Sequence, residues 1–134
     1  MAKAKLRHIA LSVPDPEASA LFYRDAFGLD IVGKANSATA TGVYLSDGTV
    51  SLALLKYRAD APAGPRGKDF VGLHHMGFIC EDLAAQSAQV EQHGATLFQD
   101  VPDVQSTEYY EKKYTDKDGI IFDITHSGWR GATA

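Results

Sequence analysis

Two stretches of the chain alternate apolar and polar residues with the period of a β-strand and then change to the period of an amphipathic helix. The first stretch reads HIALSVPDPEA over residues 8–18, and the second reads HMGFICEDLAA over residues 75–85. Each predicted helix follows an aspartate suited to the N-cap and ends at a glycine suited to a left-handed cap. The N-cap residues are Asp15 and Asp82, and the terminating glycines are Gly28 and Gly94.

The predicted order of elements occurs twice. His8 and His75 begin equivalent strands, and they lie half of the 134-residue chain apart. Short β-type runs follow each predicted helix, and each half contains one Asp-Gly hairpin dipeptide. The pattern predicts a single α+β domain of paired βαβββ modules, whose curved sheets leave a concave face opposite the helices. The dipeptides are Asp47-Gly48 and Asp118-Gly119. Module one spans about residues 1–57, the connector 58–71, module two about 72–128 and the tail 129–134.

Alternation along the strands predicts which side chains share a face. In the first strand, Ile9 and Leu11 form an apolar face for the helix, so His8 points the opposite way. The same parity places His75 away from its helix, and Asp123 lies in the middle of an apolar strand. A carboxylate in such a position needs a partner, because burying it alone would be too costly.

Composition and charge restrict the class of protein. Hydrophobic residues make up 45% and charged residues 22% of the chain, which is typical of a globular domain. A net charge of −4 leaves no broad basic face for nucleic acid. No signal-peptide or membrane-spanning segment is evident, so we expect a cytoplasmic protein without membrane partners. The single cysteine, Cys80, excludes an internal disulfide and is expected to be a buried thiol.

The two strand histidines, the run LFYRDAFGL at residues 21–29 and the run DKDGIIFDI at residues 116–124 resemble the vicinal oxygen chelate superfamily. That family includes glyoxalase I, methylmalonyl-CoA epimerase, extradiol dioxygenases and bleomycin-resistance proteins, and the likeness covers nearly the whole chain. Its members consist of paired βαβββ modules around a divalent metal ion that binds adjacent oxygens of a substrate. The resemblance therefore implies a half-open cup of curved sheet with the helices on the outside. The resemblance implies that the metal ligands here are His8, His75 and Asp123.

The chain departs from the family pattern at the fourth ligand, which is usually Glu or Gln in the last strand of the first module. The corresponding positions, Leu52 or Ala53, are apolar, and the last ligand is Asp123 where Glu is usual. Extradiol dioxygenases omit the same fourth ligand. Two histidines and one carboxylate suit Fe²⁺ as the first choice, with Mn²⁺, Zn²⁺, Ni²⁺ or Co²⁺ as alternatives.

Two classes of function follow from the resemblance. The first is a divalent-metal-dependent enzyme that acts on a small molecule chelated through adjacent oxygens, either a glyoxalase-like lyase or isomerase or an extradiol-type dioxygenase. The alternative is a non-catalytic protein that binds a drug or metabolite, of the bleomycin-resistance type. The resemblance also implies a homodimer.

The catalytic candidates lie before the last hairpin. Glu111, Tyr110 or Tyr114 is where we expect a proton donor or acceptor that reaches the cavity, although alternating tyrosines in a strand usually serve sheet packing. Helix spacing predicts that Phe22 and Phe27 belong to the core. His74 points away from His75, which favours a role in solvent or at an interface.

Overall fold

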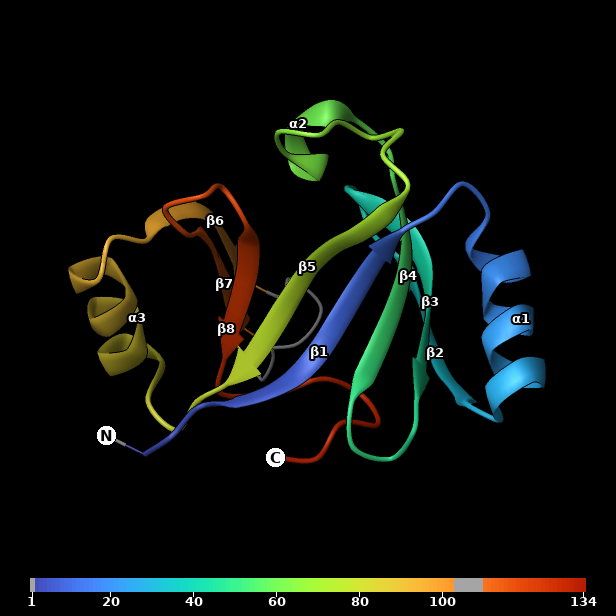
Figure 1. Cartoon of the computed structure of the whole chain (residues 1–134), viewed down its shortest axis with the longest axis horizontal. Helices are drawn as coiled ribbons and strands as arrows, with labels where there is room; N and C mark the ends of the chain where they lie inside the picture. The colour runs from blue at the N-terminus through green and yellow to red at the C-terminus, as the bar shows by residue number, and fades with distance from the viewer. Residues whose placement is uncertain (1, 103–109) are drawn as a thin grey trace. The chain divides into compact units, whose positions relative to one another are not determined.

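The computed structural model describes residues 2–102 and 110–134 (Figure 1). Its elements follow the predicted βαβββ order in each half, so the α+β class and the paired modules are confirmed. A short helix, α2, lies in the connector and is not part of the predicted pattern. The elements are β1 (Lys5–Ser12), α1 (Pro16–Phe27), β2 (Asp30–Asn36), β3 (Ala40–Ser46), β4 (Ser51–Tyr57), α2 (Asp60–Ala63), β5 (Gly72–Ile79), α3 (Leu83–Gln92), β6 (Thr96–Pro102), β7 (Tyr110–Thr115) and β8 (Ile121–Thr125).

The chain divides into two compact units. The N-terminal unit comprises residues 8–74 and 130–133, and the C-terminal unit comprises residues 75–129 with 1–7 and 134. The division falls inside β1 and inside β5, so each of these strands contributes residues to both units. The single-domain organisation stays a prediction.

In the N-terminal unit the strand order is β2-β3-β4-β1. Strands β2, β3 and β4 pair antiparallel, and β1 pairs parallel to β4 with His8 opposite Ser51. Helix α1 covers one face, where Ala20 packs with Val43, Leu45 and Leu54 (Figure 1). Leu11 packs against this cluster, whereas Ala10 belongs to a second cluster with Ala53 and Leu55. The predicted alternation along the first strand is therefore confirmed.

In the C-terminal unit the strand order is β5-β8-β7-β6, with β5 parallel to β8 and β7 antiparallel to both of its neighbours. Phe78, Tyr114 and Phe122 form a row of ring contacts on one face, and Tyr114 connects that face to α3 by donating a 2.9 Å hydrogen bond to Glu91. Cys80 is buried as expected, and desolvation raises the pKa of its thiol.

Both long helices begin at the predicted aspartates. Asp15 accepts a hydrogen bond from the backbone amide of Ala18 at 3.1 Å, and Asp82 accepts one from Ala85 at 3.0 Å. These bonds satisfy amides that have no partner inside the helix. Helix α1 ends at Gly28, whose φ of 74° is in the left-handed region. No helix among the described residues is long and apolar enough to cross a membrane.

The aromatic residues of α1 depart from the prediction. Phe22 and Phe27 are 57% and 68% exposed, so the expectation that they belong to the core is wrong. The helix turns the small residue Ala20 toward the sheet, and Phe22, Tyr23 and Phe27 instead contact one another, with ring centroids 5.1 to 6.1 Å apart. Periodicity shows that a helix has an apolar stripe, but packing decides which part of that stripe meets the sheet.

The two Asp-Gly dipeptides both lie in turns, with different capping residues. Asp47 accepts 2.8 Å hydrogen bonds from the amides of Thr49 and Val50. In the second turn the capping residue is Asp116, which accepts hydrogen bonds from the amides of Asp118 and Ile120.

Candidate functional site

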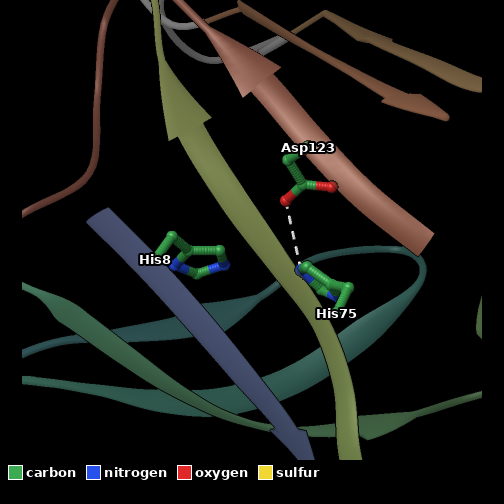
Figure 2. A group of neighbouring side chains, drawn as sticks. All are labelled: His8, His75 and Asp123. Atoms are coloured by element: carbon green, nitrogen blue, oxygen red, sulfur yellow. Dashed lines mark ion pairs between the residues drawn. The ribbon is translucent and has the colours of Figure 1, made fainter. Parts of the chain in front are cut away.

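His75 and Asp123 meet inside the C-terminal unit. His75 lies on β5 and Asp123 on the parallel neighbour β8, on the same face of the two strands. The Nε2 atom of His75 is 3.1 Å from Oδ2 of Asp123, and both side chains are almost fully buried, at 2% and 1% exposure (Figure 2). The sequence predicted that Asp123 needs a partner, and the ring of His75 contacts one of its two carboxylate oxygens.

Lys113 is a member of this cluster that the sequence analysis missed. It lies on β7 directly opposite Asp123, and its Nζ atom donates a 2.7 Å hydrogen bond to Oδ1 of Asp123. The same Nζ is 3.3 Å from Oε1 of Glu111. The signal was present in the sequence, because alternation along β7 places Glu111 and Lys113 on one face and Tyr114 on the other. What the sequence lacked was the register between β7 and β8.

The three predicted catalytic candidates have different surroundings. Glu111 is buried beside Lys113 in the cluster of His75 and Asp123. Tyr114 is fully buried and bonded to Glu91 of α3, and desolvation raises the pKa of its hydroxyl group. Tyr110 begins β7, but its side chain lies outside the described part of the structure. The structure therefore brings Glu111, and not Tyr114, to the cluster.

His8 is buried in the N-terminal unit, with its Nδ1 atom 3.3 Å from the hydroxyl oxygen of Ser51 on β4. The register of β1 with β4 shows which of the two positions expected for a fourth ligand faces the same way as His8. Ser51 and Ala53 share the face of His8, whereas Leu52 packs into the cluster under α1. Of the two positions expected from the sequence, Ala53 is on the right face and has no ligand atom. Ser51 supplies the nearby hydroxyl oxygen, which sequence reasoning did not single out.

His74 is held by contacts within the N-terminal unit, in contrast to the expected role in solvent or at an interface. Its Nε2 atom is 2.5 Å from the carbonyl oxygen of Ala63 in α2. Its Nδ1 atom is 3.3 Å from the hydroxyl of Tyr57, and the two rings contact at 4.7 Å between centroids. His74 thus connects α2 with Tyr57 of β4.

The donor set fits a divalent metal ion. Within the C-terminal unit, His75 and Asp123 offer an imidazole nitrogen and a carboxylate oxygen from buried side chains, and such an ion takes both kinds of ligand atom. Two ligand atoms at about 2.1 Å from one ion and at right angles are separated by about 3 Å. The 3.1 Å between Nε2 of His75 and Oδ2 of Asp123 matches that separation.

Solved structures with the same fold carry epimerase and synthase names. A methylmalonyl-CoA epimerase variant from Streptomyces coelicolor, in complex with 2-nitronate-propionyl-CoA, is 21% identical with a TM-score of 0.75, covering 92% of this chain and 96% of its own. The epimerase from Mycobacterium tuberculosis is 15% identical with a TM-score of 0.72, covering 92% and 90%. A 4-hydroxymandelate synthase mutant from Streptomyces coelicolor is 15% identical with a TM-score of 0.75, covering 98% of this chain and 41% of its own.

A search among curated proteins finds no match to the chain. The family model of the glyoxalase/bleomycin resistance protein/dioxygenase superfamily matches residues 5–124, which is most of the chain and includes all three candidate ligands. The resemblance recognised in the sequence is therefore confirmed, and this chain belongs to the glyoxalase/bleomycin resistance protein/dioxygenase superfamily.

Proposed function

We propose that this protein is a divalent-metal-dependent enzyme that binds a small molecule through two adjacent oxygens, with His8, His75 and Asp123 as the metal ligands. The observation that carries the proposal is the buried pair of His75 and Asp123, whose donor atoms lie 3.1 Å apart. We include His8 because of the sequence repeat, since its position in module one corresponds to that of His75 in module two. Fe²⁺ is the first choice of metal for two histidines and one carboxylate.

In the proposed reaction, the metal ion and the side chains have different roles. A bound divalent ion supplies Lewis acidity toward adjacent substrate oxygens. His75 and Asp123 hold their donor atoms in fixed positions, because both side chains are buried and in contact. Glu111 is the proposed group for proton transfer, since it is a buried carboxylate on the strand face of Lys113.

The reaction type divides into two routes. A lyase or isomerase route needs a group that moves a proton next to a carbonyl, and Glu111 is the candidate for it. The epimerases of the same fold are consistent with this route. A dioxygenase route needs iron and oxygen and is consistent with the apolar residue at position 53.

The experiment that tests the proposal measures the metal content of protein purified without air, by elemental mass spectrometry, for the wild type and Asp123→Ala. We expect near-stoichiometric metal in the wild type and its loss in the variant. Asp118→Ala is the matched control, because it removes an exposed carboxylate from the turn before β8 and should keep the metal.

The same experiment with His8→Ala tests whether the N-terminal unit supplies a ligand, with His126→Ala as the exposed control. Loss of metal with His8→Ala and retention with His126→Ala would support the three-residue set. Iron with oxygen uptake on catechols would favour the dioxygenase route, and other divalent metals would favour the lyase or isomerase route. Absence of specific metal in the wild type, even after incubation with divalent ions, would refute the proposal and favour a non-catalytic binding protein.

Two further parts of the proposal concern the protein in the cell. We propose a homodimer in the cytoplasm with a small-molecule substrate as its ligand. Light scattering on the purified protein tests the dimer, and a mass of 14.4 kDa would contradict it. Fractionation of cells that express the full chain tests the location.

A further inference from the structure

We infer that Lys113 is a positioning residue that competes with the metal ion for Asp123, and that it limits this carboxylate to one oxygen for the ion. The inference rests on the proposed metal site. It concerns contacts within the C-terminal unit only, since His75, Lys113 and Asp123 all belong to that unit.

The two oxygens of Asp123 have different neighbours. Oδ1 accepts the 2.7 Å hydrogen bond from Nζ of Lys113, whereas Oδ2 faces Nε2 of His75 at 3.1 Å. Lys113 is fixed from its other side by Oε1 of Glu111 at 3.3 Å. Oδ1 is engaged by a charged donor. Oδ2 is therefore the oxygen that can bind the metal ion together with Nε2 of His75.

The charge of Lys113 acts in two ways. In the metal-free protein it offsets the charge of a carboxylate that is fully buried, which would otherwise be costly. When a dication binds, the same ammonium group repels it. At separations of a few ångströms, the interaction of one charge with a dication corresponds to about a tenfold change in affinity even in the dielectric of water.

Lys113 therefore lowers the affinity of the site for the metal ion and keeps one coordination position open. Without it, Asp123 could bind the ion with both oxygens, which would fill one more coordination position. With it, the ion keeps that position for a substrate oxygen. Outer residues of this kind orient ligands and tune metal sites generally.

The experiment compares Co²⁺ binding by the wild type, Lys113→Met and Lys113→Arg, with affinity measured by competition against a chelating dye and coordination read from the visible absorption per bound ion. We expect Lys113→Met to bind Co²⁺ about tenfold more tightly. We also expect its visible absorption per bound ion to change, because the second oxygen of Asp123 would replace a solvent ligand. Lys113→Arg keeps the positive charge and should match the wild type in both measurements. Lys112→Met is the matched control, since it removes the same charge from the other face of β7 and should change neither.

Several results would overturn the inference. Unchanged affinity with an unchanged spectrum in Lys113→Met would mean that Lys113 does not contact the ligand oxygen in the loaded protein. Weaker binding would mean that the residue only supports the fold, and equal behaviour of the Met and Arg variants would mean that the charge is irrelevant. If Lys113→Met folds only with metal, its spectrum is read on protein refolded in Co²⁺, and the same spectral shift is expected. A wild type that binds no Co²⁺ would instead refute the proposed metal site.

Discussion

The pair of Lys113 and Asp123 should be a measurable part of the stability of the metal-free protein. Asp123 is fully buried and Lys113 is 12% exposed, with 2.7 Å between Nζ and Oδ1. Removing one partner of a buried ion pair leaves the other charge uncompensated, at a cost of about 3–5 kcal/mol. We expect about 3 kcal/mol for Lys113→Met, at the lower end, because His75 still contacts Asp123.

Such a loss is large beside the free energy of unfolding of an ordinary domain, about 5–15 kcal/mol. It corresponds to a fall in Tm of about 10 °C for a chain of this size. For Asp123→Asn we expect about 2 kcal/mol, since Lys113 keeps its contact with Glu111. The double variant should lose about 3 kcal/mol, less than the sum of the single losses, so the coupling free energy is about 2 kcal/mol.

The assay is urea unfolding in the presence of a chelator, followed by the fluorescence of Trp129, which belongs to the same unit. Lys112→Met serves as the control and should change the free energy of unfolding by no more than about 0.5 kcal/mol. A coupling below about 0.5 kcal/mol would refute the reasoning, because the two groups would then be solvated independently.

Three further predictions test other parts of the structure. Gly42→Ala should prevent native pairing of β3 with β4 and reduce soluble expression, because an added Cβ would clash with the carbonyl oxygen of Leu54; a wild-type yield and circular dichroism spectrum would contradict this. The Cys80 thiol should react slowly with a disulfide reagent in folded protein and rapidly in urea, since burial raises its pKa, and equal rates would show that it is accessible. Backbone amides in its turn lower the pKa of Asp47 below the ordinary 3.8, so its contribution to stability is present above that value and is lost as the pH falls through the lowered pKa. The difference in Tm between wild type and Asp47→Ala should therefore shrink in acid, and a difference independent of pH would disprove it.

Local features of this chain could be predicted from the sequence with good accuracy. The caps at Asp15 and Asp82 follow from side chains that bond amides only a few residues away, so no distant contact is needed. The shared face of His75 and Asp123 depends on strand alternation and on a repeat that equates the modules. The family match over residues 5–124 rests on the same local patterns.

Features that depend on register or on the rotation of a helix could not be predicted in this way. Phe22 and Phe27 are exposed because α1 presents Ala20 to the sheet, which depends on the shapes of both surfaces. His74 meets Ala63 because the connector folds into a helix with no strong sequence pattern.

The sequence by itself determined the order of the strands and the two long helices, the helix starts and the parity of the three proposed ligands, since each depends on interactions between near neighbours along the chain. Only the tertiary structure decided that Lys113 bonds Asp123, that Glu111 joins them and that Tyr114 turns to α3. The physical reason is that the pairing of β7 with β8 brings residues from different strands into contact. A shift of one residue in that register would exchange every side chain between the two faces of the sheet.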